Sequence, residues 1–439
     1  MKRIFPAYAY GPGPRSSCWW DDTAAASDWP VFQGGCAEVA IIGAGFTGLS
    51  AAYHMAKSGV SVSVLDAEIP GWGASGRNGG FCCLGGAKLG TAALAKRYGA
   101  DADVYSAAEH AAVDLVAQLL RDLDIDADCH SDGETELAHT PRAMTALRTE
   151  AALLRAAGLD HDLIEAEDLP GQGLGTGFHG ALTRRAGFAL NPRKYVLGLA
   201  QTAAHAGARI FGHSPALSIT RQPTGHAITT PHGVLQAKQV IIATNGYSSE
   251  DLPDWLGGRY MPAQSTILVT RPLTQDELAA QSWHSPQMAF DTRHLLHYFR
   301  LMPDRRFLFG MRGGLLSSPR AERQARARTR KDFERMFPAW RHVPDTHSWS
   351  GLVCLSRDLV PFVGAVPGHP GLFAGLAYHG NGVAMGSYAG RLLADQILSQ
   401  SSDLPYPKLM QTPPRRFPLG RARRLVMPPA YALMRLADL

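Results

Sequence analysis

The sequence has little of what marks several classes of protein. It holds only six cysteines in 439 residues, in no zinc-binding spacing, and Cys82 and Cys83 are adjacent. Charged residues make up 18% of the chain, and the formal net charge is only +5. No apolar run of the secretory kind follows Lys2 and Arg3. We therefore expect no metal site, no nucleic-acid partner and a reducing, cytoplasmic location.

Glycine, by contrast, is abundant and clustered. The chain has 46 glycines, of which residues 43–86 hold 11 and residues 364–390 hold 8. Hydrophobic residues make up 45% of the sequence, which is typical of a folded protein with a large core and excludes a collagenous or disordered chain. Residues 39–56 lack Asp, Glu, Lys and Arg over the length of a membrane span. Their spaced glycines indicate another structure, so we expect no transmembrane segment.

A nucleotide-binding fingerprint occupies the first glycine-rich segment. Residues 38–42 are predicted to form a buried strand, residues 49–57 a helix, and residues 61–65 a second strand that ends at Asp66. The first strand and the helix are joined by GAGFTG, a GxGxxG pattern. Its glycines permit a tight turn, close approach to a pyrophosphate and close helix–strand packing. Asp66 has the position of an acid that binds ribose hydroxyls, so the segment predicts a dinucleotide site.

Three further segments indicate which dinucleotide is bound. Residues 71–80 read GWGASGRNGG, a loop that a plain nicotinamide-binding domain does not need. Residues 234–246 are predicted to form a strand that returns to the nucleotide sheet and ends in a turn of small residues. Residues 371–383 combine a strand, a glycine turn and the start of a helix, whose positive end suits an anion or a carbonyl group.

These segments, in this order, resemble the D-amino-acid oxidase/glycine oxidase superfamily of FAD-dependent oxidoreductases. The GWGASGRNGG string is similar to the gamma-glutamylputrescine oxidase-like branch. The resemblance implies bound FAD, which we expect to be non-covalent. It also implies an α/β fold in which a Rossmann-type FAD-binding domain is interleaved with an α+β substrate domain built on a mostly antiparallel sheet.

The domains are expected to be discontinuous in the chain. The FAD-binding domain takes residues 38–90, 175–250 and 351–400, and the substrate domain takes residues 91–174 and 251–350. Helices are predicted at 107–123 and 141–154, a strand at 264–271, and a hairpin from 294–301 and 306–312. Residues 1–37 form an N-terminal arm. Residues 401–439 are expected to pack on the body, with contact to a membrane surface as an alternative.

The resemblance implies a set of cofactor contacts along these segments. The GxGxxG turn would hold the diphosphate, Asp66 the adenosine ribose, the backbone of Ala216 the adenine, and the turn at 379–383 the carbonyl side of the flavin. The complete expected set is Gly43, Gly45, Phe46, Thr47, Gly48, Asp66, Ala67, Ser75, Arg77, Asn78, Gly79, Gly80, Ala216, Thr244, Gly246, His379, Gly380, Asn381, Gly382 and Val383.

One departure from the family pattern bears on the substrate. Amino-acid-directed members carry an Arg in the stretch that matches residues 349–354, where it grips the substrate carboxylate, and this chain has Val353 there. Its absence argues for an amine whose charge lies elsewhere, although Arg300 or Arg357 could replace the missing Arg. Cys354 is expected to be a buried apolar cysteine rather than a covalent link to the flavin.

The expected reaction is oxidation of the C–N bond of a small, gamma-glutamylputrescine-like amine. Hydride passes to flavin N5, the imine is hydrolysed, and oxygen or another acceptor takes the electrons. Strand alternation puts Tyr298 and Arg300 on one face, and these two residues with His379 are the candidate catalytic residues. Alternatives are an N-demethylating or amino-acid oxidase or dehydrogenase, a tailoring oxidase of a cyclic amine, or a flavin-binding redox sensor that uses Cys82 and Cys83.

Overall fold

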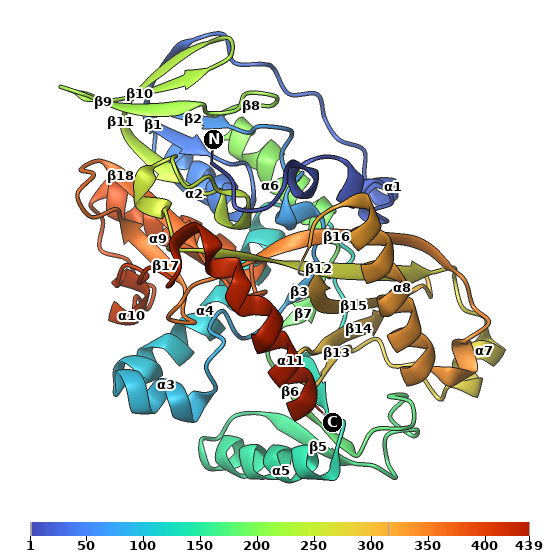
Figure 1. Cartoon of the computed structure of the whole chain (residues 1–439). Helices are drawn as coiled ribbons and strands as arrows, with labels where there is room; N and C mark the ends of the chain where they lie inside the picture. The colour runs from blue at the N-terminus through green and yellow to red at the C-terminus, as the bar shows by residue number, and fades with distance from the viewer. Residues whose placement is uncertain (1, 315, 439) are drawn as a thin grey trace.

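Two eight-stranded sheets form the framework of the protein (Figure 1). The structure is a computed structural model that describes residues 2–314 and 316–438. The chain crosses between the sheets several times, so each sheet is assembled from segments far apart in the sequence. The predicted fold class, a Rossmann-type domain interleaved with an α+β domain, is confirmed.

The first sheet, the nucleotide sheet, has the strand order β17-β18-β11-β1-β2-β8, with a hairpin attached to β11. β18, β11, β1, β2 and β8 are parallel, and β17 is antiparallel to β18. The strands are β1 (Gly35–Ile42), β2 (Val62–Leu65), β8 (Arg209–Phe211), β9 (Ser218–Gln222), β10 (Gly225–Thr230), β11 (Gly233–Ile242), β17 (Phe362–Ala365) and β18 (Leu372–Leu376).

Helices cover one face of the nucleotide sheet and bury its apolar strands on that side. The side chains of Val39, Ile41 and Val64 pack into a core formed with these helices. The strands are buried on both faces, which is why they read as apolar runs rather than as alternating patterns. The covering helices are α2 (Phe46–Lys57), α4 (Asp101–Asp122), α6 (Pro192–His205) and α9 (Ala384–Leu398).

The second sheet has the order β16-β12-β15-β14-β13-β4-β6-β5 and is antiparallel except for the β13–β4 pair. The predicted hairpin is present as β14 paired with β15. The strands are β4 (Glu134–Leu137), β5 (His161–Glu165), β6 (Gly180–Arg184), β12 (Met261–Thr270), β13 (Met288–Asp291), β14 (His297–Leu301), β15 (Phe307–Gly314) and β16 (Asp345–Leu355). A short separate pair joins β3 (Phe81–Cys82) to β7 (Phe188–Ala189).

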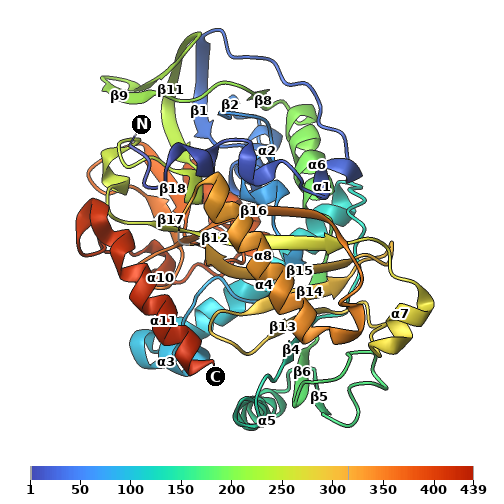
Figure 2. The same cartoon turned by 45° about the vertical axis from the view of Figure 1, so that its right-hand side comes forward.

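Aromatic side chains fill the core beneath α8 (Pro319–Met336), which lies across the second sheet (Figure 2). Trp283 is fully buried, and its ring centroid lies 5.6 Å from that of Phe299 and 5.5 Å from that of Phe307. The remaining helices are α1 (Trp20–Thr23), α3 (Thr91–Tyr98), α5 (Pro141–Ala156), α7 (Gln275–Ala280), α10 (Lys408–Gln411) and α11 (Met427–Ala437).

The sheets divide the chain at different points from those expected from the sequence. β6 pairs with β4 and β5, so residues 180–184 belong to the second sheet although we assigned 175–250 to the nucleotide domain. β16 pairs with β12 along its whole length, so residues 351–355 also belong to the second sheet. No local feature of the sequence marks these boundaries, because they are set by pairing between distant strands.

The C-terminal segment packs on the body of the protein. Helix α11 runs across the front of the molecule in Figure 1, and Tyr431 on it is buried. The Asp438 carboxylate accepts hydrogen bonds from the backbone N–H groups of His294 (2.7 Å) and Leu295 (3.2 Å). Leu433 and Leu436 remain exposed on the outer face of this helix. Among the described residues, no helix has the length and apolarity needed to cross a bilayer.

Replacing Trp283 with alanine should lower the free energy of unfolding by about 3–5 kcal/mol, because the aromatic cluster can collapse only partly into the space left. Leu153→Ala on α5 is the matched control: this side chain is 66% exposed, so we expect a change within about 0.5 kcal/mol. Chemical denaturation followed by circular dichroism measures both. Equal losses in the two variants would contradict the central position of Trp283.

Candidate active site

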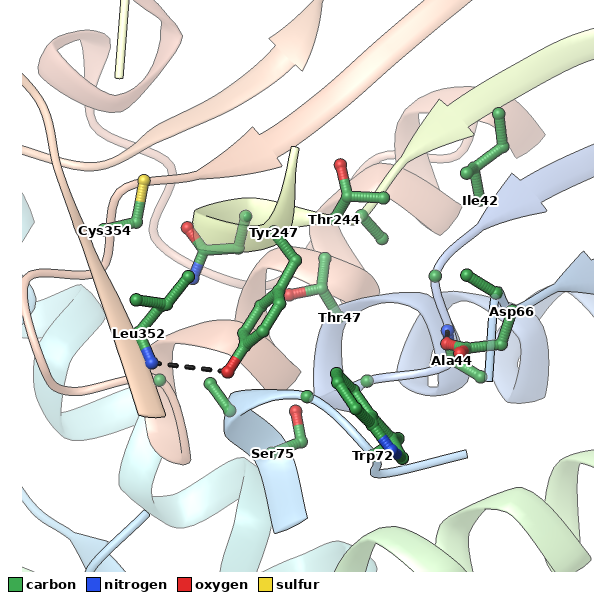
Figure 3. Close-up of a pocket in the computed structure, with 18 of the residues that line it drawn as sticks. Ile42, Ala44, Thr47, Asp66, Trp72, Ser75, Thr244, Tyr247, Leu352 and Cys354 are labelled. Atoms are coloured by element: carbon green, nitrogen blue, oxygen red, sulfur yellow. Dashed lines mark hydrogen bonds between the residues drawn. The ribbon is translucent and has the colours of Figure 1, made fainter. Parts of the chain in front are cut away.

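A cavity, here called the first cavity, opens at the carboxyl ends of the parallel strands of the nucleotide sheet. Residues directly after β1, β2, β11 and β18 all line it, which is the usual ligand position in a sheet of this kind. Asp66 and Ala44 lie at one end of the view in Figure 3, and Leu352 and Cys354 lie at the other, with Tyr247 between these two groups. The cavity is therefore elongated, as a dinucleotide requires.

Two glycines of the fingerprint are required by close backbone packing. Gly43 has a φ of +106°, and a Cβ atom there would lie 2.8 Å from the Ala243 carbonyl oxygen. A Cβ atom at Gly48 would lie 2.0 Å from the Gly43 carbonyl oxygen. The first glycine thus forms the turn, and the third lets α2 pack against it. Neither position leaves room for a side chain.

Asp66 is held in place by the turn that it faces. Its carboxylate accepts hydrogen bonds from the backbone N–H groups of Ala44 (2.7 Å) and Glu68 (2.9 Å). Burial raises the pKa of Asp66, while these two hydrogen bonds oppose that shift. A fixed acceptor at the end of β2 suits the hydroxyl groups of a ribose.

The loop at residues 71–80 is fastened to the start of α2. The Ser75 hydroxyl accepts a hydrogen bond from the Phe46 backbone N–H at 3.0 Å. The Asn78 side chain stabilises the loop itself: it accepts from the Gly80 N–H and donates to the carbonyl groups of Ala74 and Ser75. The loop is thereby fixed along the first cavity, which Ser75 and Asn78 both line.

Arg77 supplies a buried positive charge beside this loop. It is 1% exposed, its guanidinium stacks 4.2 Å from the ring centre of Trp72, and it donates to the carbonyl groups of Trp72 and Ser350. Its Nη2 atom has no hydrogen-bond partner among the described residues. Burial lowers the pKa of Arg77. An unpaired donor and an uncompensated charge here favour a ligand that carries negative charge or carbonyl oxygens.

A second cavity lies against the first and is walled by the second sheet and by residues between 74 and 88. Six residues line both cavities, from the loop at 71–80, from β16 and from the turn after β18; they are Ala74, Asn78, Leu352, Val353, His379 and Gly380. Gly79, Tyr298 and Asn381 line the second cavity. A ligand in one cavity would thus contact a ligand in the other at this shared wall.

The second cavity is lined by polar side chains and by acidic and basic ones. The Tyr298 and Ser265 hydroxyl oxygens are 3.0 Å apart, and burial raises the pKa of Tyr298 to about 12, so the phenol is neutral. Burial also raises the pKa of Glu134, to about 7. Arg312 donates from Nη2 to the His379 carbonyl oxygen at 2.6 Å, and its positive charge is the largest cause that lowers the pKa of Lys88, to about 7.

His379, which we predicted to be catalytic, has both ring nitrogens bonded to the protein. Nδ1 lies 2.7 Å from the Gly86 carbonyl oxygen, and Nε2 accepts from the Ser356 backbone N–H at 3.1 Å. Burial lowers its pKa to about 4, so the ring is neutral. The backbone φ of +52° places it in a tight turn. His379 therefore stabilises the shared wall, and neither of its ring nitrogens is free for proton transfer.

Arg300 and Arg357, the two candidates for a substrate anchor, do not face the second cavity. Arg300 lines a separate, smaller cavity with Trp20 and His130, and it donates to the Leu190 carbonyl oxygen at 2.8 Å. Arg357 is exposed and donates to the Arg416 carbonyl oxygen. Tyr298 and Arg300 both lie against the Phe81 ring, as expected of one strand face, but only Tyr298 lines the second cavity.

Most of the predicted cofactor residues line the first cavity. They are Gly43, Gly45, Phe46, Thr47, Asp66, Ala67, Ser75, Asn78, Ala216, Thr244, His379, Gly380 and Gly382. Four of the predicted residues line neither cavity and contribute only to the packing around the cavities: Gly48, Gly80, Gly246 and Val383. At Gly80, for example, a Cβ atom would lie 2.0 Å from the Leu190 carbonyl oxygen. Ala216 lies in the loop between β8 and β9.

Of the cysteines near the cavities, Cys82 and Cys354 are buried and Cys83 is partly buried. Cys354 lines the first cavity, and burial raises its pKa to about 12. Burial also raises the pKa values of Cys82 and Cys83 well above the ordinary value. The thiolate is the reactive form of cysteine, so these residues are poorly suited to a covalent flavin link or to a redox sensor.

The sequence analysis missed several residues that line these cavities. Arg3 and Tyr10 of the N-terminal arm reach the first cavity, and the rings of Tyr10 and Tyr247 are 6.2 Å apart. Nothing in the irregular arm indicates this. Arg312 could have been found: Tyr298 pairs with Gly310 across the hairpin, and Arg312, two residues along β15, shares that face.

Comparisons with known proteins agree with this arrangement. A family model described as DAO, FAD dependent oxidoreductase, matches residues 38–396. Probable oxidoreductase OrdL of Rhizobium meliloti is 30% identical over 412 residues, which cover 89% of this chain and 90% of that protein. Gamma-glutamylputrescine oxidoreductase of Escherichia coli is 27% identical over 389 residues, which cover 88% and 89%. Glycine oxidase from Geobacillus kaustophilus superposes with a TM-score of 0.71 at 20% identity, covering 84% of this chain and 96% of that one.

Gly43→Ala should weaken flavin binding about ten-fold or more, because a side chain at a φ of +106° costs about 1–2 kcal/mol and forces the turn away from Ala243. Gly59→Ala is the matched control: it has a φ of +82° at the other end of α2, but no atom lies within 4 Å of the added Cβ. Titration of the flavin-free proteins with FAD, followed by flavin fluorescence, gives both affinities. Equal weakening by the two variants would argue against the crowding described here.

Proposed function

Because the chain belongs to the DAO family of FAD-dependent oxidoreductases, we propose that it oxidises the C–N bond of a small amine bound in the second cavity. One observation carries this proposal: the two cavities share a wall lined by residues of both sheets. A substrate in the second cavity would contact a flavin in the first at that wall, and hydride transfer requires such contact.

The residues of the first cavity fit FAD. We infer that Asp66 binds the adenosine ribose and that the Gly43–Gly48 turn and the start of α2 hold the diphosphate. The flavin ring would be held at the shared wall, and Arg77, which lines the second cavity beside that wall, would offer its unpaired Nη2 as a donor. Burial of the Cys354 thiol supports non-covalent binding. Acid precipitation that leaves a yellow supernatant would be consistent with this, and a yellow pellet would contradict it.

FAD, when bound, supplies the hydride acceptor for the carbon of the C–N bond. The protein's part is to hold the amine at the shared wall in its neutral form, which burial away from water favours. Loss of the hydride from the neutral amine leaves an iminium ion, so the nitrogen keeps its proton. Water then adds to the C=N carbon, and the carbonyl compound and the protonated amine leave. Tyr298 donates or accepts one hydrogen bond at the substrate, and no general base is required.

We propose a gamma-glutamyl amine or a related small amine as the substrate class. Two features support it: the 27% identity to gamma-glutamylputrescine oxidoreductase, and Val353 in the wall of the second cavity. A carboxylate held directly at residue 353 would need an Arg there. The electrons are proposed to pass to oxygen or to another acceptor.

Anaerobic reduction of the bound flavin by a panel of amines tests the function. The panel contains gamma-glutamylputrescine, putrescine, sarcosine and D-alanine, and bleaching of the flavin absorbance is the readout. We expect bleaching by at least one amine, followed by reoxidation with air or an artificial acceptor. Formaldehyde release would identify N-demethylation instead. If FAD is bound and no amine bleaches it, the proposed function is wrong.

Tyr298→Phe should lower kcat/KM for the best amine about three- to ten-fold, because one hydrogen bond at the substrate is lost. The FAD content should not change, since Tyr298 lines only the second of the two cavities. Tyr406→Phe is the control: that hydroxyl donates to the Val363 carbonyl oxygen, and neither residue lines either cavity. Steady-state kinetics gives both values, and equal effects of the two substitutions would contradict a role for Tyr298 in the reaction.

A further inference from the structure

The N-terminal arm lies before the stretch that the family model matches, which begins at residue 38. Figure 2 shows the arm, in the darkest blue, crossing the molecule between the nucleotide sheet and β16. Two parts of it reach the cofactor region. Arg3 and Tyr10 line the first cavity, and residues 15–20 contact the loop at 71–80. The arm therefore adds contacts at this cavity to those of the matched residues.

Two buried side chains of the arm fasten the loop at 71–80 through its backbone. The Arg15 guanidinium donates from Nη1 to the Trp72 carbonyl oxygen at 2.8 Å. The Trp20 indole donates to the Asn78 carbonyl oxygen, also at 2.8 Å. Arg15 and Trp20 are 8% and 2% exposed, so water cannot readily replace either bond. The loop is thus held by the arm at two points, six residues apart.

Both points lie next to groups at the cavities. The Trp72 carbonyl oxygen accepts from Arg77 Nε at 2.8 Å as well as from Arg15, so the arm acts on the same atom that orients Arg77. Asn78 lines both cavities, and Trp20 holds its backbone. Loss of these bonds would let the loop shift, and with it the groups beside the shared wall.

The beginning of the arm forms part of the wall of the first cavity. The Glu250 backbone N–H donates to the Lys2 carbonyl oxygen at 3.0 Å, and the Lys2 backbone N–H donates to the Asp251 carboxylate at 2.8 Å. These bonds hold the residue that precedes Arg3. The Arg3 guanidinium stacks 4.4 Å from the ring centre of Tyr10, and its Nε atom has no hydrogen-bond partner among the described residues.

We propose that the N-terminal arm holds the cofactor in the first cavity. Arg15 and Trp20 are positioning residues that fix the loop at 71–80, and Arg3 contacts the cofactor directly. The inference rests on the proposed function for the identity of the cofactor as FAD. Oxidised FAD carries its negative charge on the diphosphate, which a guanidinium in the wall of that cavity would attract. The arm thus both shapes the site and slows the release of the flavin.

Trp20→Phe tests the contact with the loop, because it keeps an aromatic ring and removes the indole N–H. Trp29→Phe is the matched control: it is the same change in the same arm, at an indole nitrogen that has no hydrogen-bond partner among the described residues, and Trp29 lines neither cavity. Titration of the flavin-free proteins with FAD gives the dissociation constants. We expect Trp20→Phe to raise the constant about 5- to 50-fold and Trp29→Phe to change it less than about two-fold.

A merely structural loss would leave the bound flavin unchanged, so its visible circular dichroism is recorded as well. We expect this signal to change in Trp20→Phe, because the loop beside the flavin has moved, and to stay the same in Trp29→Phe. The rate of flavin release, measured by dilution, should rise with the dissociation constant in Trp20→Phe. A lower free energy of unfolding without any change in FAD affinity, release rate or flavin signal would contradict the positioning role.

Arg3→Gln tests the direct contact. Lys2→Gln is the matched control, since it removes one positive charge from the neighbouring residue, which is exposed and lies outside both cavities. We expect Arg3→Gln to weaken FAD binding about ten-fold at low salt, and less at high salt, where the attraction to the diphosphate is screened. Lys2→Gln should change the affinity less than about two-fold at either salt concentration.

The proposal is overturned if neither Trp20→Phe nor Arg3→Gln weakens FAD binding more than its control does. Far-ultraviolet circular dichroism of the flavin-free variants verifies that each is folded, and the Arg3 pair still decides the question if Trp20→Phe does not fold. The arm and the reaction fail separately. If the arm variants loosen the flavin and no amine bleaches it, the reaction is wrong. If amines bleach the flavin and the arm variants bind it as tightly as their controls, the role of the arm is wrong.

Discussion

Hydrogen bonds at and beside the wall between the two cavities determine where a cofactor and a substrate would meet. Arg312 of the second sheet donates to the His379 carbonyl in the turn that follows the nucleotide sheet, and the Trp349 indole donates to the Arg77 carbonyl at 2.7 Å. Each bond joins segments far apart in the chain. The interleaved fold therefore has a direct use: it brings strand ends from one sheet and strand faces from the other to a single surface.

Two positive charges lie beside that wall, because Arg77 and Arg312 both line the second cavity. Arg77 lies on the side of the loop at 71–80 and Arg312 on the side of β15, and both are held by backbone carbonyl groups rather than by acids. Carbonyl groups orient a guanidinium without cancelling its charge. A flavin gains negative charge on reduction, and positive charge that is not cancelled by an acid would stabilise it.

Most of the fold and the cofactor part of the site could be predicted from the sequence, and the reason is physical. The Gly43–Gly48 turn, Asp66 and the loop at 71–80 are contiguous segments whose chemistry is local, so their spacing revealed them. Arg312 and Lys88 are single residues in unremarkable contexts, and they become a pair only through the pairing of β14 with β15 and the course of the loop after β3. For the same reason β6 was assigned to the wrong sheet.

Trp72 allows binding in the first cavity to be observed by fluorescence. Its indole lines the first cavity, and its face is covered by the Arg77 guanidinium, so it lies at contact range of whatever the cavity holds. Indole emission overlaps flavin absorption, and energy transfer at contact range is efficient. The fold thus carries its own fluorophore at the cofactor, through which the arrival and departure of a flavin can be followed without a label.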